Sequence, residues 1–361
     1  MQLFEAVATV NELRLLAEGE PIEITGTVSD EIDLPRLKHK KDFGTKNYSD
    51  AVYQGEIKFG KRQGKGIMKY RNGRVYEGQW YDDMRHGHGF EQYSNKNTYV
   101  GDFFQGKAEG KGIYSWTNGE LYDGQWKDGL KHGHGVWRGI NGDSYIGEWK
   151  FSKADGYGVH VWRNGDRYEG EWKSCLKHGN GTDIFANGDI YIGEYKYGRP
   201  DGYGQYVWKN GSSYVGEFKS GLKHGKGKWK KSQGDEVNTY EGEYRFDKKF
   251  GYGVFKWASG NIYRGHYNND EREGEGEMIW TDQSVYIGHW VRGIQHGWGK
   301  MIFPDGKVKE GYFDNNIFKG RNIPESGFRP LPPPTDKETT PAPRRAPSAQ
   351  QSPHHHIPLS P

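Results

Sequence analysis

Histidines recur at a fixed interval in this chain, and their chemistry has to be considered first. They are equally spaced, each directly before a Gly-x-Gly sequence and directly after a basic residue: His86, His132, His178 and His224. Acidic residues hold the same place midway between them: Glu109, Asp155 and Asp201. Imidazole and carboxylate groups are common zinc ligands, and histidine changes charge near neutral pH. A metal site and a pH-sensitive switch are therefore the two kinds of chemistry that this spacing suggests.

The distances involved argue against a metal site. A repeat of two adjacent strands advances by about 10 Å, so histidines in alternate repeats lie about 20 Å apart. Zinc–nitrogen bonds are only about 2 Å long. We therefore expect no metal and no cofactor, and we predict that the histidines and acids are turn residues of alternating charge along one edge of the structure.

The Gly-x-Gly sequences also resemble part of a phosphate-binding loop. Such a loop leads into the N-terminus of a helix and usually carries a lysine at a fixed spacing. Here Gly-x-Gly opens a strand-like stretch and recurs along the chain, as at Gly133 and Gly135. No nucleophile, acid or base stands in an identifiable catalytic setting. The sequence therefore predicts a protein that is not an enzyme.

Tyrosines 23 residues apart, with one longer interval between Tyr214 and Tyr240, define the elements that position these groups. Each anchor tyrosine is followed by glycine two residues later and usually by Trp, Phe or Tyr after two more. The anchor tyrosines are Tyr53, Tyr76, Tyr99, Tyr122, Tyr145, Tyr168, Tyr191, Tyr214, Tyr240, Tyr263 and Tyr286. Residues at i, i+2 and i+4 share one face of a strand. A fixed short period of this kind indicates a repeat array.

Each repeat is predicted to be a β-hairpin. Asn-Gly pairs, such as Asn118-Gly119 and Asn164-Gly165, favour tight turns because they accept a positive φ. Glycine within a strand marks a close approach by another group. We expect an aromatic ring from a neighbouring hairpin, at the fifth position of the repeat as in Trp149, to lie over the bare glycine, as in Gly147.

The pattern resembles the MORN repeat (membrane occupation and recognition nexus). Eleven copies run from Tyr53 to Val308, and a truncated twelfth, KEGYFDNN, has Lys309 in place of the tyrosine. The resemblance implies an all-β fold, an elongated single-sheet stack of β-hairpin repeats. It also implies scaffolding in cytoskeletal, ciliary or membrane-apposed structures, with phospholipid binding as a proposed property of the family. The lipid kinase and methyltransferase domains that accompany such repeats in other proteins would not fit in the residues outside the array.

Three segments are expected along the chain. Residues 1–52 form a lead-in with a short N-terminal helix over residues 1–18, a strand-like stretch at 22–28 and an irregular, charged stretch from Asp30 to Asp50. Residues 53–320 form the array, with a three-residue insertion near 232–239 and a loop, SQGDEVN, beside it. Residues 321–361 form a disordered tail rich in proline, with polyproline II character.

Composition agrees with a stack whose units contact only their neighbours. The chain has 55 glycines, 25 tyrosines and 13 tryptophans, and its mean hydropathy of −1.02 is too low for an ordinary globular core. A net charge of +3 predicts no strong attraction to nucleic acid. The one cysteine, Cys175, indicates a reducing, cytoplasmic compartment. No apolar stretch approaches the length that spans a bilayer.

Aromatic residues in the second strands exceed what an isolated stack needs. They are Tyr114, Trp116, Trp162, Tyr206, Trp208, Phe255 and Trp257. Because aromatic anchors dominate protein interfaces, we predict a non-enzymatic interaction scaffold that binds a protein partner along this aromatic-rich sheet face. The resemblance favours a cytoskeletal or ciliary partner, in the cytoplasm and at the periphery of a membrane. A targeting subunit of an enzyme is an alternative, and an open strand edge at the truncated repeat makes a homo-oligomer another.

A second alternative rests on a cluster of lysines. Lys226, Lys228 and Lys230 alternate along one strand and should share a face, with Lys231 beside them. Such a basic patch predicts binding of anionic phospholipid or of an acidic partner surface. The competing interpretation is a solvated strand face that Asp235 and Glu236 partly neutralise.

Overall fold

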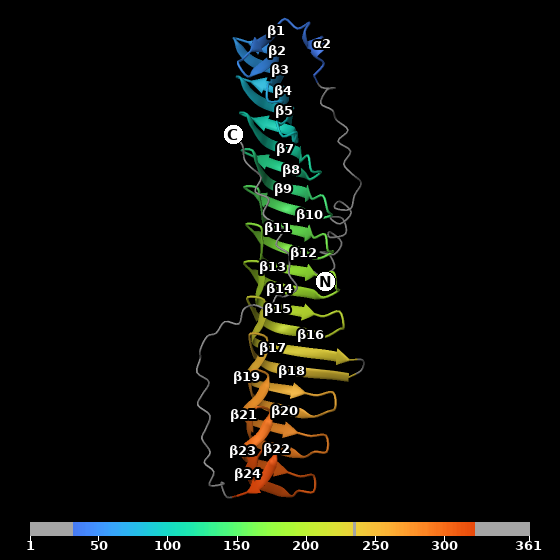
Figure 1. Cartoon of the computed structure of the whole chain (residues 1–361), viewed down its shortest axis with the longest axis vertical. Helices are drawn as coiled ribbons and strands as arrows, with labels where there is room; N and C mark the ends of the chain where they lie inside the picture. Colours follow the sequence, from blue (N-terminus) through green and yellow to red (C-terminus); the bar gives the residue numbers. More distant parts are fainter. Residues whose placement is uncertain (1–31, 234–235, 322–361) are drawn as a thin grey trace, which may run out of the picture. The chain divides into compact units, whose positions relative to one another are not determined.

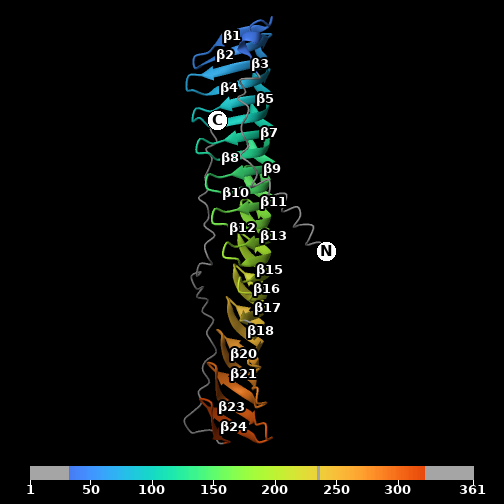
Figure 2. The same cartoon turned by 90° about the vertical axis from the view of Figure 1, so that its right-hand side faces the viewer.

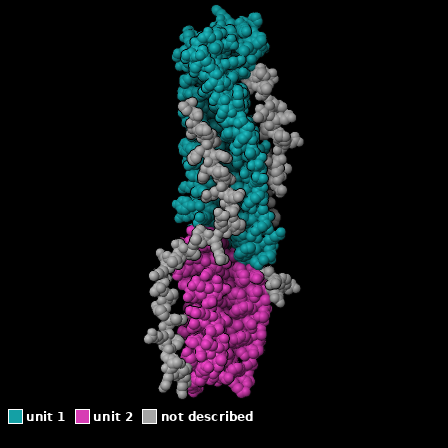
Figure 3. All heavy atoms as spheres, viewed as in Figure 1, with its two compact units in different colours: residues 1–213 teal, residues 214–361 magenta. Residues whose placement is uncertain are grey.

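The computed structural model describes residues 32–233 and 236–321 (Figure 1). The predicted N-terminal helix, the strand at 22–28 and the proline-rich tail lie outside the described residues. Contacts divide the chain into two compact units, residues 1–213 and residues 214–361 (Figure 3). In the part of the chain that the structure describes, no helix is long and apolar enough to cross a membrane.

Within its described residues, unit 1 contains one short helix and an open antiparallel sheet in which each strand pairs with the next in sequence. Its elements are α2 (Leu34–Leu37), β1 (Phe43–Asn47), β2 (Ala51–Lys58), β3 (Lys61–Tyr70), β4 (Val75–Tyr81), β5 (Met84–Gln92), β6 (Thr98–Phe104), β7 (Lys107–Ser115), β8 (Leu121–Lys127), β9 (Leu130–Arg138), β10 (Ser144–Lys150), β11 (Lys153–Val161), β12 (Arg167–Lys173), β13 (Leu176–Ile184), β14 (Ile190–Lys196) and β15 (Arg199–Val207).

Unit 2 repeats the same hairpin without a described helix. Its strands are β16 (Ser213–Lys219), β17 (Leu222–Gln233), β18 (Glu236–Arg245), β19 (Lys248–Lys256), β20 (Ile262–Asn268), β21 (Glu271–Ile279), β22 (Val285–Val291), β23 (Ile294–Ile302), β24 (Val308–Asp314) and β25 (Ile317–Gly320). Figure 2 shows the hairpins of each unit following one another in chain order. The prediction of an all-β, single-sheet stack of hairpins is confirmed.

Glycines lie opposite glycines where neighbouring strands pair. Gly147 of β10 pairs with Gly158 of β11, and Gly158 pairs in turn with Gly170 of β12. The ladder of each hairpin then shifts register, as it does between Gly147 and Trp149. At this bulge Gly156 has a φ of +106°, and a Glu148 carboxylate oxygen accepts a hydrogen bond from the Tyr157 backbone N–H at 3.1 Å. The bulge explains both the first glycine of Gly-x-Gly and the acid or amide that precedes the fifth-position aromatic.

The anchor tyrosines form the core, and they correct one prediction. A Cβ placed on Gly158 would lie 2.3 Å from the Tyr145 hydroxyl oxygen, and one on Gly147 would lie 2.8 Å from it. The ring over the bare glycines is therefore the tyrosine of the same hairpin, and not the fifth-position aromatic of a neighbouring one. The tyrosine side chain lies along its own strand toward Glu148, and its hydroxyl donates to the Glu148 carbonyl at 3.0 Å.

The fifth-position aromatics connect one repeat to the next. The Trp149 ring packs edge-on against Tyr145 and against Tyr122 of the preceding repeat, with ring centroids 5.0 and 5.3 Å away. Its indole N–H donates to the Gly135 carbonyl at 3.1 Å. Edge-to-face pairs of this kind add stability beyond the area that they bury. A continuous ladder of buried rings thus takes the place of an aliphatic core.

The lead-in is more ordered than predicted. Residues Asp30 to Asp50 were expected to be irregular, but they contain α2 and β1. The helix begins after Asp33, whose side chain accepts from the Arg36 backbone N–H at 3.0 Å, and proline stands in its first turn. Strand β1 pairs with β2, with Thr45 opposite Gln54, and Leu37 packs on Ile67. Because this stretch is charged, its sequence did not indicate β1, which extends the sheet beyond the first repeat.

The insertion is also more regular than predicted. The stretch SQGDEVN was expected to form a loop, but β17 and β18 continue through most of it. Ser232 pairs with Val237 and Gln233 pairs with Glu236, and only residues 234–235 lie outside the described residues. Figure 1 shows β17 and β18 reaching beyond the other strands of unit 2. Three extra residues lengthen the hairpin because the antiparallel ladder continues into them.

Candidate functional site

The histidines and acids that alternate along the chain make two kinds of turn contact. The ring of His132 lies 5.9 Å from Phe151 in the next turn, centroid to centroid, and the Asp155 carboxylate accepts from the Ser174 backbone N–H at 3.0 Å. The same two contacts recur at His86–Phe104, His178–Tyr197, His224–Phe246, Glu109–Asp128 and Glu273–Arg292. Within residues 32–233 and 236–321, no group of three or more His, Cys, Asp or Glu side chains could hold a metal ion. The alternation therefore has a structural cause in how successive turns pack.

The seven predicted aromatic residues lie half-buried on the face that carries the anchor tyrosines, called here the tyrosine face. Tyr114 pairs across the ladder with both Tyr99 and Tyr122, so its side chain shares their face. The seven occupy only two places in the repeat, which are those of Tyr114 and Trp116. Three neighbouring pairs result, with centroids 4.5 to 4.8 Å apart: Tyr114–Trp116, Tyr206–Trp208 and Phe255–Trp257. The structure thus brings each pair together within its own hairpin, in unit 1 for the first two and in unit 2 for the third.

Trp162, the remaining predicted residue, stacks on a histidine that the sequence did not single out. The rings of His160 and Trp162 lie 4.2 Å apart and 5° from parallel. His160 holds the place in its repeat that Tyr114 and Tyr206 hold in theirs, where an aromatic ring is usual. That shared place was the signal by which His160 could have been found.

Burial makes His160 sensitive to acid. Its Nε2 atom is buried and has no hydrogen-bond partner within the described residues, and burial lowers the pKa of His160 to about 4. Between about pH 6.5 and pH 4 the unfolded chain binds a proton at this residue and the folded chain does not. Stability is therefore highest above pH 6.5 and falls as the pH is lowered to about 4.

We expect His160→Gln to reduce this loss. The wild-type chain should lose up to about 3 kcal/mol between pH 7 and pH 4 through this group alone, and the variant should lose less by that amount. Urea unfolding at both pH values measures the difference. The control is His132→Gln, which alters an edge histidine in a turn. An equal change in pH dependence for both variants would show that His160 is not the group responsible.

Basic residues nine positions after the anchor tyrosine form a row that the sequence pattern only hinted at. They lie among the aromatic rings of the tyrosine face: Arg62, Arg85, Lys131, Lys177, Lys223, Lys249 and Arg272. Lys177 forms an ion pair with Asp183 at 2.5 Å, and Asp183 also accepts from the Tyr195 hydroxyl at 2.6 Å. Arg85 pairs with the fully buried Glu91 in the same way. These residues combine charge with aromatic surface on the tyrosine face.

Lys131 has no carboxylate paired with it in the described residues, in contrast to Arg85 and Lys177. Only 6% of the residue is exposed, and its ammonium group lies 4.4, 5.3 and 5.7 Å from the ring centroids of Trp149, Tyr122 and Trp116. Burial lowers the pKa of Lys131 to about 8. Attraction between the cation and the rings therefore offsets only part of the cost of burying this charge.

The lysine cluster is exposed, as predicted, but faces acidic residues. Lys228 lies opposite Glu241 across the β17–β18 ladder and forms an ion pair with it at 3.3 Å. Lys226 lies opposite Glu243. Lys226 and Lys228 therefore each have an acid beside them on the same face, whereas Lys230 lies opposite Thr239 and Lys231 lies opposite Asn238. The cluster is therefore less basic as a surface than the alternation of lysines in the sequence suggests.

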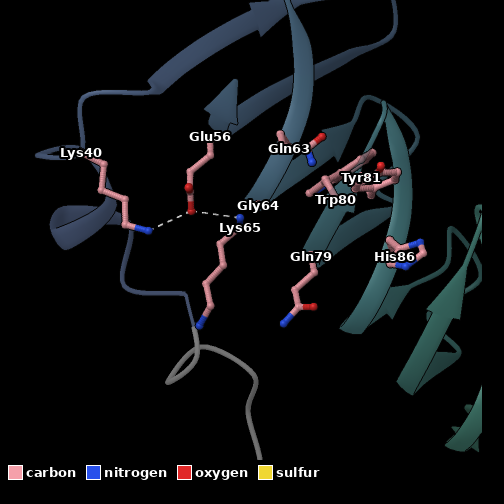
Figure 4. Close-up of a pocket in the computed structure, with 9 residues that line it drawn as sticks. All are labelled: Lys40, Glu56, Gln63, Gly64, Lys65, Gln79, Trp80, Tyr81 and His86. Carbon is pink, nitrogen blue, oxygen red and sulfur yellow. Dashed lines mark hydrogen bonds and ion pairs between the residues drawn. The ribbon is translucent and has the colours of Figure 1, made fainter. Parts of the chain in front are cut away.

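One open hollow lies beside the first hairpins of unit 1 (Figure 4). It is lined by Lys40, Glu56, Gln63, Gly64, Lys65, Gln79, Trp80, Tyr81 and His86. The Glu56 carboxylate is already bonded at its edge, to the Lys40 ammonium at 2.9 Å and to the Lys65 backbone N–H at 3.1 Å. The lining presents no nucleophile beside a general base, so the hollow has no arrangement for acid–base or nucleophilic catalysis.

Comparisons with known proteins agree with the repeat. The family model for the MORN repeat matches residues 53–73, 76–98, 99–120, 122–144, 145–167, 168–190, 191–213, 214–236, 240–262, 263–285 and 286–308. A comparison with curated protein sequences found no match.

Among solved structures, the chain is similar to the SAS-4 (dCPAP) TCP domain of Drosophila melanogaster in complex with a proline-rich motif of Ana2 (dSTIL). The identity is 13%, over 49% of this chain and 94% of that one, with a TM-score of 0.29. It is also similar to a catalytically inactive virginiamycin B lyase from Staphylococcus aureus with quinupristin, at 12% identity over 76% and 85% of the two chains, with a TM-score of 0.13. Scores this low support no conclusion about this chain.

Proposed function

The chain belongs to the MORN-repeat family, and from that premise we propose that it is a non-enzymatic interaction scaffold that binds a protein partner along the tyrosine face. The observation that carries the proposal is the set of half-buried aromatic pairs on that face, such as Tyr114–Trp116 and Tyr206–Trp208. Their rings keep exposed surface that the stack does not use. Rigid aromatic side chains of this kind are the usual anchors of protein interfaces.

The row of basic residues supports a protein partner further. Lys177 lies 4.7 Å from the ring centroid of Trp162, so charge and aromatic surface stand side by side on the tyrosine face of unit 1. Such a combination offers a partner segment an apolar anchor with polar groups beside it. We propose a cytoplasmic partner of the cytoskeleton or cilium.

Two other functions have weaker support. Binding of anionic phospholipid would use the lysine cluster at Lys226, Lys228, Lys230 and Lys231, but Glu241 and Glu243 lie beside it on the adjacent strand. Neighbouring acids reduce the attraction to an anionic bilayer. A targeting subunit of an enzyme would use the same tyrosine face, so it differs from the scaffold only in its partner.

The double substitution Trp162→Ser with Trp208→Ser is expected to reduce partner binding at least tenfold. These two rings lie on the tyrosine face of unit 1 in alternate repeats, and truncating an interface anchor commonly costs about 2 kcal/mol or more, which is roughly thirtyfold in affinity. Capture of proteins from a cytoskeletal extract by the immobilised full chain, quantified by mass spectrometry, measures the loss. Circular dichroism and thermal unfolding check that the variant folds.

A matched control lies in the same two repeats on the opposite face. Tyr157 and Tyr203 are 49% and 58% exposed, and Tyr157→Ser with Tyr203→Ser removes as much aromatic surface without touching the tyrosine face. Capture should survive in this control. Undiminished capture by the folded tryptophan variant would refute the proposal, whereas loss of capture together with loss of co-sedimentation with anionic vesicles would favour the lipid alternative.

A further inference from the structure

In three consecutive repeats of unit 2, an aromatic residue directly follows the second strand. The three residues are Trp257, Trp280 and Phe303. Each stands two positions after the residue of the second strand that pairs with the anchor tyrosine of the same hairpin, and all three are half-buried. Each begins a turn, because its backbone N–H and carbonyl both bond across the four residues that follow, as Trp280 does with Ser284 and Gln283. The three rings therefore repeat once per hairpin, at one level of the sheet.

The indole N–H groups of Trp257 and Trp280 have no hydrogen-bond acceptor within residues 32–233 and 236–321. The fifth-position tryptophans differ in this respect, since each donates to a glycine carbonyl of the preceding repeat, as Trp290 does to Gly276 at 3.2 Å. A tryptophan at an interface usually presents its ring to apolar groups and its N–H to an acceptor. The row in unit 2 thus offers both an apolar surface and unused donors.

The spacing of these three rings matches the repeat of a polyproline II helix. Each repeat adds two strands about 4.8 Å apart, so the rings recur about every 9.6 Å. A polyproline II helix rises about 3.1 Å per residue and repeats every three residues, which is about 9.3 Å. Its backbone carbonyls have no internal hydrogen bonds, and aromatic-lined grooves are the surfaces that recognise it. A proline-rich segment can therefore present equivalent residues and carbonyls to successive rings.

The chain itself supplies such a segment next to this row. Arg329 to Pro334 reads RPLPPP, and seven residues separate it from Arg321, the last described residue after β25. Seven extended residues span up to about 25 Å. Trp280 lies two repeats before the truncated one, about 20 Å along the sheet. The segment can reach Phe303 and Trp280 without any rearrangement of the hairpins.

We propose that residues 329–334 bind the tyrosine face of unit 2, with Pro330 and Pro333 packed on Phe303 and Trp280 and with a backbone carbonyl accepting from the Trp280 indole N–H. The inference rests on the proposed function of the tyrosine face as a binding surface and names one ligand for it. Because the segment is tethered, its effective concentration at this row is in the millimolar range, so even a weak contact is occupied. A partner that binds unit 2 must then displace the segment.

Indole N–H resonances of the full-length, 15N-labelled chain test the contact. The variant Pro330→Gly, Pro332→Gly, Pro333→Gly and Pro334→Gly removes the polyproline II preference of the segment. We expect the indole signal of Trp280, assigned through Trp280→Phe, to shift in this variant, and those of Trp162 and Trp208 to stay in place. The matched control alters four prolines further along the tail, Pro341, Pro343, Pro347 and Pro353, to glycine and should leave all three signals unchanged.

A synthetic peptide of residues 327–336 gives an independent measurement. Added to the four-glycine variant, it should restore the wild-type position of the Trp280 signal saturably, and a peptide with the same four glycines should bind at least tenfold more weakly. Unchanged signals in the variant together with no response to the peptide would overturn the proposal, and so would a response confined to Trp162 and Trp208. Neither outcome affects the Trp162 and Trp208 capture experiment, which tests the proposed function in unit 1 alone.

Discussion

Gly158→Ala is expected to destabilise the folded chain by about 3 kcal/mol or more. A Cβ at this position would lie 2.3 Å from the Tyr145 hydroxyl oxygen and 2.6 Å from its ring carbon Cζ. The ring has little room to move, because Tyr145 is 3% exposed and packs edge-on against Trp149 and Trp172. Overpacking, together with loss of the hydrogen bond from Tyr145 to the Glu148 carbonyl, accounts for the magnitude. Urea unfolding measures it.

Gly129→Ala is the matched control, since a Cβ there meets no heavy atom within 4 Å. Its φ of +82° still costs about 1 kcal/mol, because residues other than glycine rarely adopt this conformation. The difference between the two variants isolates the contact with the ring. If both lost the same stability, the tyrosine would not be what requires glycine at position 158.

The sequence predicts the hairpins well because their causes are local and repeated. Alternation of residue types, Asn-Gly turns and the 23-residue period each point to the same strands, and the structure has them. The sequence could not show which ring covers Gly147, because Tyr145 stands two residues before it and Trp149 two residues after it on the same face. The choice depends on the register shift between Gly147 and Trp149, which turns the tryptophan toward the preceding repeat.

The sequence failed to predict features that depend on pairing or stacking with other residues, or that lie in a charged stretch. Strand β1 lies in a charged stretch outside the 23-residue pattern, and it forms because β2 offers an open edge to pair with. The aromatic residues of the candidate site could be predicted from the repeat pattern, since they recur at fixed places in the repeat. His160 was missed because its ring matters through stacking on Trp162 and not through the zinc or acid–base chemistry that histidine suggests.

The repeat pattern also does not predict how burial affects the stability contributed by each basic residue among the aromatic rings. Lys131 and Lys177 stand at identical places in alternate repeats, each before a histidine, and the repeat pattern offers no reason to separate them. The residue six positions later decides their surroundings: Asp183 accompanies Lys177, whereas Trp137 accompanies Lys131. One lysine is therefore paired within its own hairpin, and the other is surrounded by rings.

The same substitution at these two lysines is expected to change stability in opposite directions. Lys177→Met should destabilise the chain by about 3–5 kcal/mol, because it leaves the Asp183 carboxylate, 5% exposed, without its cation. Lys131→Met should stabilise it by about 1–3 kcal/mol at pH 7, because the lysine charge is buried there without a carboxylate and methionine keeps the contacts of the stem. Urea unfolding of both variants in the full chain measures the two changes.

The pH dependence of the stability and one double variant test the cause of each of these two changes. The pKa of Lys131 is lowered to about 8, so the cost of burying its charge is fully present below pH 8 and is relieved as the pH rises to about 10.5, where the unfolded chain also loses the proton. The advantage of Lys131→Met should shrink over that interval. At the other site, Lys177→Met with Asp183→Asn should recover most of the loss, since the amide is neutral and its oxygen can still accept from Tyr195. If the double variant were as unstable as Lys177→Met alone, the loss would come from packing of the lysine stem and not from an unpaired carboxylate.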